Sequence, residues 1–164
     1  MTAKVFLFEK DKSIISRAIA HVSGSPITHS AVYYEGAMFD SSEVRGKFGR
    51  ADIKDHLDRK VRVHHIGVSD IQLAQWVVLN WGKKYDWRGI GGWVMYHLFK
   101  RWFTFSRNNS KSRVYCHEAV ADLIRIVQGG KLKFPVHVSG DHIKNQLGKP
   151  EFVGTLQDYL DHAN

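Results

Sequence analysis

The chain has 164 residues, 43% of them hydrophobic and 12% aromatic, which predicts one folded domain, 1–164, rather than a disordered chain. Its single cysteine excludes an intrachain disulfide framework. The net charge of +8 favours anionic partners, such as a cell-wall polymer or a membrane surface, reached through basic patches. No helix-turn-helix or zinc-finger pattern is present, so we expect no specific nucleic-acid partner.

The N-terminal segment predicts a strand followed by a helix. Residues 3–9 alternate weakly and indicate the strand. Apolar residues at helical spacing from Ile14 to Val22 indicate the helix, with Asp11 as its N-cap and Gly24 as its stop. The apolar run at the N-terminus is too short for a signal peptide, which favours a cytoplasmic protein or delivery by a phage particle or a secretion apparatus.

A hairpin comes next, and it carries a histidine. Residues 28–34 and 37–42 predict two strands joined by a tight turn at Glu35-Gly36. That turn pairs Tyr34 with Ala37, Ala31 with Asp40 and His29 with Ser42. Cross-strand partners share a face, so Asp40 and Ser42 are predicted to lie on the side of His29, with Asp40 diagonally next to its ring. A carboxylate there would hold the tautomer of the imidazole and stabilise its charged form.

The middle of the chain predicts connecting elements. Residues 44–60 are charged and predict a loop with a short helix, and 61–68 predict a third strand. Ser69 is the expected cap of a helix to about Trp81, followed by a turn at 82–87. Residues 89–103 predict an aromatic helix with interleaved cations, which suits either core packing or a lipid or sugar surface. Residues 107–112 predict a polar loop.

The single cysteine opens the next predicted helix. Five apolar residues follow Cys116 at helical spacing, namely Ala119, Val120, Leu123, Ile124 and Val127. The thiol therefore lies at the N-terminus of the helix on its buried face, where the helix dipole favours a thiolate. The alternative is a small core side chain, just as a strand histidine can be purely structural.

The tail adds short helices at about 140–147 and from about residue 155. The whole order predicts an α+β domain in which helices cover one side of a small antiparallel sheet. His64 and His65 point to opposite faces of a strand and Cys116-His117 lacks the spacing of metal ligands, so we expect no metal and no cofactor.

Four segments resemble the circularly permuted NlpC/P60 (papain-like) superfamily, in which the histidine strand precedes the cysteine helix, as in YiiX/YebB-like hydrolases. They are 25–34, 38–42, 82–87 and 114–120. The resemblance spans roughly residues 3–127 in its order of elements. His117 stands where the family usually has a serine, and Asp40 occupies a third catalytic position that is often Glu or His.

The resemblance implies a permuted papain-like fold and a cysteine hydrolase that cleaves an amide bond through a thiol acyl-enzyme. Cys116 would be the nucleophile, His29 the base and then the acid, and Asp40 the orienting group. The backbone N–H of Cys116 would bind the oxyanion, with Tyr115, Tyr85 and Ser42 as further candidates for contact with the oxyanion or the substrate.

Three functions remain open from the sequence. The first is hydrolysis of a peptide, an isopeptide or a peptidoglycan peptide. The second is a lipid acyl hydrolase or acyltransferase of the lecithin retinol acyltransferase type, favoured by the aromatic and cationic residues around Trp102. The third is a non-catalytic basic binding module on the same fold.

Overall fold

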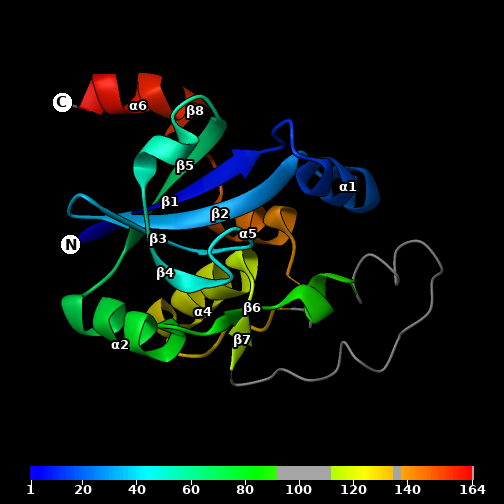
Figure 1. The fold of residues 1–164 in the computed structure, drawn as a ribbon. Coiled ribbons are helices and arrows are strands. Elements are labelled where there is room, and N and C mark those ends of the chain that lie inside the picture. The colour runs from blue at the N-terminus through cyan, green and yellow to red at the C-terminus, as the bar shows by residue number, and fades with distance from the viewer. Residues whose placement is uncertain (92–111, 135–137, 164) are drawn as a thin grey trace.

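The computed structural model describes residues 1–91, 112–134 and 138–163. Its centre is an eight-stranded sheet with the order β7-β6-β4-β3-β2-β1-β5-β8, antiparallel except for the β6–β7 pair (Figure 1). The strands are β1 (Thr2–Glu9), β2 (Ile27–Tyr34), β3 (Ala37–Ser42), β4 (Lys47–Ala51), β5 (Lys60–Gly67), β6 (Lys84–Tyr85), β7 (Arg113–Val114) and β8 (Phe152–Thr155). The helices are α1 (Ile14–Ser23), α2 (Asp70–Asn80), α4 (Cys116–Val127), α5 (Gly140–Leu147) and α6 (Leu156–Ala163), with a 3₁₀ turn η1 (Ile53–His56).

Both faces of the sheet are covered. On one face, Val5 and Leu7 of β1 pack with α2, α4 and α5. On the other face, Phe6 and Phe8 pack with α6. Figure 1 shows α6 on one side of the sheet and α2, α4 and α5 on the other. The chain is therefore α+β as predicted, but the expectation of a small sheet covered on one side was wrong, because the central strands bury side chains on both faces.

Most predicted elements form where the sequence places them. Ser69 caps α2, and α4 and α5 start and end as expected. The N-cap of α1 is Ser13 rather than Asp11, because the Ser13 side chain accepts from the N–H of Ser16, whereas Asp11 accepts from the N–H of Ser13. Gly24 ends α1 in the left-handed conformation, as predicted.

Four strands lie where none was predicted. Residues 44–60 contain β4, the predicted turn at 82–87 contains β6, and the segments just before α4 and α6 contain β7 and β8. In β4 only Phe48 is buried, so the segment has no apolar alternation to reveal it. The predicted helix at 89–103 and the predicted loop at 107–112 lie almost entirely outside the described residues. Residues 87–91, which the structure does describe, are helical.

The predicted hairpin register holds near the turn. Glu35 and Gly36 both have positive φ, as a two-residue turn of this kind requires, and Tyr34 pairs with Ala37. The described ladder runs only as far as Val32 and Phe39. The predicted pairs Ala31 with Asp40 and His29 with Ser42 are therefore wrong. From there β3 continues its pairing with β4 and leaves β2.

The buried Trp76 ties α2 to α4, since its indole N–H donates to the carbonyl of Ala119 at 2.6 Å and its ring packs edge-on against Phe48. Replacement of Trp76 by Ala should lower the free energy of unfolding by about 3–5 kcal/mol, measured by urea denaturation. Trp81→Ala, just beyond the end of the same helix and 58% exposed, is the control and should cost less than about 1 kcal/mol. Equal effects of the two changes would contradict this packing.

Candidate active site

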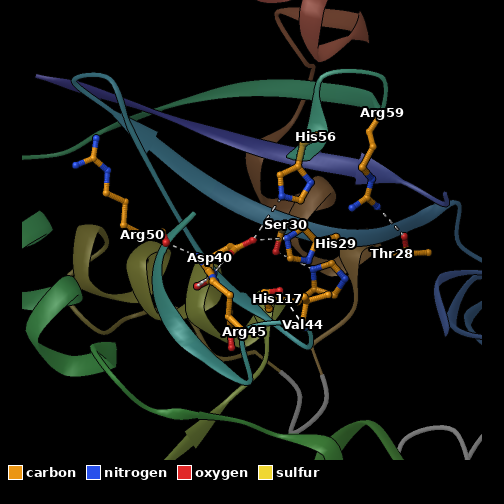
Figure 2. A network of polar contacts seen from close by, with 12 residues as sticks. Thr28, His29, Ser30, Asp40, Val44, Arg45, Arg50, His56, Arg59 and His117 are labelled. Atoms are coloured by element: carbon orange, nitrogen blue, oxygen red, sulfur yellow. Dashed lines mark hydrogen bonds and ion pairs between the residues drawn. The ribbon is translucent and has the colours of Figure 1, made fainter. Parts of the chain in front are cut away.

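His29 and Asp40 form a buried pair. The Nε2 atom of His29 lies 2.8 Å from Oδ2 of Asp40, and the two side chains are 9% and 1% exposed (Figure 2). Although β2 and β3 have separated at this level, the two side chains still point toward each other. Since Nε2 is engaged, Nδ1 is the ring nitrogen of His29 that is available to another group.

Asp40 is held on its other side by an arginine that the sequence analysis did not single out. Arg45 contacts Oδ1 of Asp40 and also donates to the Asp40 carbonyl at 3.1 Å. Arg45 lies in the turn between β3 and β4, and this short connection brings its guanidinium back to the carboxylate. One oxygen of Asp40 is thereby bound by Arg45, and the other faces His29.

The neighbouring residues on the same two strands anchor the cysteine helix. Ser30 hydroxyl lies 2.9 Å from Nδ1 of His117, and Ser41 hydroxyl donates to the Val114 carbonyl at 2.7 Å. Both serines are fully buried. The two hairpin strands are thus bonded to the segment that begins α4, directly beside Cys116.

Cys116 is buried at the first position of α4 and has a perturbed acidity. Burial raises the pKa of the thiol, but the charges of His117 and His29 and their hydrogen bonding to the sulfur outweigh it and hold the pKa well below its ordinary value. The next residue, His117, is also buried; its Nδ1 contacts the Ser30 hydroxyl, and its charge is one of the causes that lower the thiol pKa.

Two further residues of the site come from 44–60, the segment predicted to be a loop with a short helix. The ring of His56 stacks on that of His29, with centroids 5.5 Å apart and planes 7° from parallel, and on Phe8 at 4.9 Å. Burial, with the charges of His29, Arg59 and Arg45, lowers the pKa of His56 to about 3, so that its ring is neutral. The guanidinium of Arg59 lies over the ring of Phe8, with its central carbon 5.1 Å from the ring centroid.

Two adjoining pockets meet at these residues. The first is mainly apolar, and Cys116 and His117 line it together with Ile27, Ile90 and Val138. The second is polar, and His29, Asp40, Arg45, His56 and Arg59 line it. Ile19, Thr28 and Tyr85 line both pockets, so the pocket of the thiol adjoins the pocket of His29 and Asp40.

The remaining predicted site residues differ in their surroundings. The hydroxyl of Tyr115 donates to the Val138 carbonyl at 2.9 Å and accepts from the Val138 N–H at 2.7 Å, so its proton is engaged away from the thiol. Burial and the charge of Cys116 raise the pKa of Tyr85 far above its ordinary value, so Tyr85 stays protonated. Ser42 lines the polar pocket and accepts from the N–H of Val44 at 3.2 Å.

Comparison of the sequence with models of known protein families gives no match, and comparison with curated proteins gives none either. None of the helices in the described ranges combines the length and the apolar character that a membrane span requires.

The acidity of Cys116 can be measured without a substrate, because it is the single cysteine of the chain. We expect the rate of iodoacetamide labelling, followed by intact mass, to stay high at pH values well below the ordinary thiol pKa. His29→Asn and His117→Asn should each move the midpoint of the pH profile upward, since each removes a charge that stabilises the thiolate. His65→Asn, on the exposed side of β5, is the control. A wild-type midpoint at the ordinary pKa of a thiol would show that the pKa of Cys116 is not lowered.

Glu118 gives a separate pH dependence of stability. Burial raises its pKa from 4.5 to about 8, although it accepts from the Tyr115 N–H at 3.3 Å. The folded state therefore holds a proton that the unfolded state releases above about pH 4.5. The stability associated with this proton is complete below that pH and is lost as the pH rises through 8.

Glu118→Gln should remove this dependence and be more stable than the wild type at pH 9 by an amount on the order of 4 kcal/mol, with a smaller difference at pH 5, in urea titrations. Glu35→Gln in the exposed hairpin turn is the control and should track the wild type at every pH. Parallel curves for Glu118→Gln and the wild type would show that the carboxyl is ionised in the folded state.

Proposed function

We propose that the protein is a cysteine hydrolase that acts through a thiol acyl-enzyme on a peptide or isopeptide amide, peptidoglycan peptides included. The observation that carries the proposal is the buried hydrogen bond between His29 and Asp40, together with the effect of this histidine on Cys116, whose thiol pKa it helps to hold well below the ordinary value. A nucleophile, a base and an orienting carboxylate are the three groups that this chemistry needs. The order of the elements, with the histidine strand β2 before the cysteine helix α4, also supports a permuted papain-like fold.

The reaction then follows from the positions of these groups. The Cys116 thiolate attacks the carbonyl carbon, and the oxyanion is stabilised by the backbone N–H of Cys116 and by Tyr85 as a protonated donor. The C–N bond breaks as His29 gives its Nδ1 proton to the leaving amine. Water then attacks the thioester, His29 takes the proton of that water, and the acid leaves as the thiolate is restored. Asp40, bound by Arg45, keeps Nε2 protonated throughout.

The apolar pocket favours a second candidate, an acyl hydrolase or acyltransferase. Its isoleucine and valine side chains lie next to the nucleophile, where they would bind a hydrocarbon chain. In that reaction the same thioester forms on Cys116, and the leaving group is an alcohol. A non-catalytic binding module is the remaining alternative. The lowered pKa of the Cys116 thiol argues against it, because a binding surface does not need a thiol of lowered pKa.

The proposal is tested with chromogenic amides and esters, purified peptidoglycan, and intact mass to detect acylated Cys116. We expect an adduct in the wild type, none in Cys116→Ala, and turnover lowered by about 10²–10⁴-fold in His29→Ala and Asp40→Asn. His65→Ala is the control and should turn over like the wild type. The absence of any adduct on all substrates, with a correctly folded protein, would contradict the proposal.

A side chain that fills the apolar pocket would distinguish the amide hydrolase from the acyl hydrolase or acyltransferase. Ile19→Trp, from the wall shared by both pockets, should abolish turnover of long-chain acyl esters and leave acetyl esters and peptides cleaved if the pocket binds a hydrocarbon chain. Ile15→Trp, which reaches only the polar pocket, is the matched control. The lipid reading fails if the rate of the wild type does not rise with acyl chain length.

A further inference from the structure

Three side chains from different elements converge on one point of the polar pocket. They are His29 of β2, Asp40 of β3 and His56 at the end of η1, and one donor atom from each lies within 4.8 Å of the other two. Oδ2 of Asp40 is 2.8 Å from Nε2 of His29 and 3.9 Å from Nε2 of His56. Figure 2 shows both imidazoles on the same side of the carboxylate.

His56 is not explained by hydrogen bonding alone. Its Nε2 is too far from Asp40 for a hydrogen bond, and its Nδ1 is buried with no hydrogen-bond partner among the described residues. Buried polar atoms are nearly always paired, so hydrogen bonding does not account for a histidine at this position, and its Nε2 still faces the Asp40 carboxylate. Stacking on Phe8 would be served as well by an apolar ring.

We propose that His29, Asp40 and His56 form a binding site for a divalent transition metal, with zinc the best match. Two imidazoles and one carboxylate are a common zinc ligand set, and one donor atom of each lies within 4.8 Å of the others. The rings of His29 and His56 are nearly parallel, so at least one of them has to turn for both nitrogens to face one ion. The polar pocket gives the ion access and leaves room for a water as the fourth ligand.

A metal at this point would inhibit the enzyme. It takes Oδ2 of Asp40 and Nε2 of His29, which are the two atoms of the bond that orients the base. A metal-bound imidazole is also a weaker base, so Nδ1 of His29 no longer takes up the proton that hydrolysis requires. The inhibition rests on the proposed function, whereas the binding does not.

The surrounding charges set a direction for the affinity. Arg45 binds the opposite oxygen, Oδ1, and so leaves Oδ2 available, but its charge and that of Arg59 oppose a dication. Arg59 does not contact Asp40; its guanidinium lies over Phe8 and bonds the Glu9 carbonyl. Arg59→Gln should therefore tighten metal binding severalfold without removing a ligand.

The test titrates Co²⁺ alone into the metal-free protein and follows the visible absorption of the bound ion, then displaces it with Zn²⁺. We expect one site in the wild type and a loss of at least about tenfold in affinity in His56→Phe and in Asp40→Asn. His56→Phe keeps a ring against Phe8, and Asp40→Asn is a second variant that changes a different element. His65→Ala is the matched control, because His65 and Glu151 form a His–carboxylate pair on the surface, 2.6 Å apart.

The spectrum also identifies the competing site. Binding that persists in His56→Phe and Asp40→Asn, with a thiolate charge-transfer band that disappears in Cys116→Ser, would place the metal on the thiol and overturn the proposal. The absence of one-site binding in the wild type would overturn it as well. Binding without any hydrolase activity would leave the metal site standing and the proposed function refuted, while full activity in the metal-loaded protein would overturn the inhibition.

Discussion

The site depends on the alternation of side chains along two adjacent strands. His29 and Asp40 lie toward the polar pocket, and the residues that follow them, Ser30 and Ser41, lie toward the cysteine helix. Because successive side chains of a strand point to opposite faces, the two strands fix His29 and Asp40 on one side and the start of α4 on the other. The position of His29 relative to Cys116 therefore depends on these two strands and on the two buried hydroxyl bonds.

The electrostatic arrangement follows from this construction. Burial works against a thiolate, and it is outweighed because Cys116 is flanked by two imidazoles rather than one. They play different parts: His29 is bonded to Asp40, whereas His117 is bonded to the neutral Ser30. In the proposed mechanism Asp40 fixes the ring and tautomer of His29, which suits His29 to move the proton, whereas His117 acts on the thiol.

The sequence predicted the parts of this site that depend on local pattern. The register of α4 places Cys116 at a helix N-terminus on the buried face, and the positive-φ turn at Glu35-Gly36 brings β3 back beside β2. The predicted pairing of β2 with β3 beyond Val32 was wrong because β3 there pairs only with β4. The sequence of β4 has no apolar alternation from which this strand could be predicted. His56 and Arg59 were missed because they lie in a charged segment without a clear pattern. Its position depends on contact with Phe8, which is some fifty residues earlier in the chain.

His117 illustrates a different limit of sequence reasoning. Adjacent helix residues diverge by about 100°, which argues that a neighbour of the cysteine faces away from it. At the first turn of α4 both directions are buried, because β2 passes beside the helix and offers Ser30 to the imidazole. Helix geometry alone cannot reveal such a contact, since it depends on the strand that covers the helix end.

The two oxygens of Asp40 would allow one carboxylate to serve the proposed catalysis and the proposed metal site in turn. Arg45 fixes Oδ1, so the carboxylate does not need to rotate when the partner of Oδ2 changes from the N–H of His29 to a cation. The cost of the change is the loss of one buried hydrogen bond and the approach of a dication to two guanidiniums. The gain is ligation by His56, whose ring lies beside that of His29 with the centroids 5.5 Å apart. If both proposals hold, a carboxylate with one fixed and one exchangeable oxygen would support the base and also be the point at which a metal disables it.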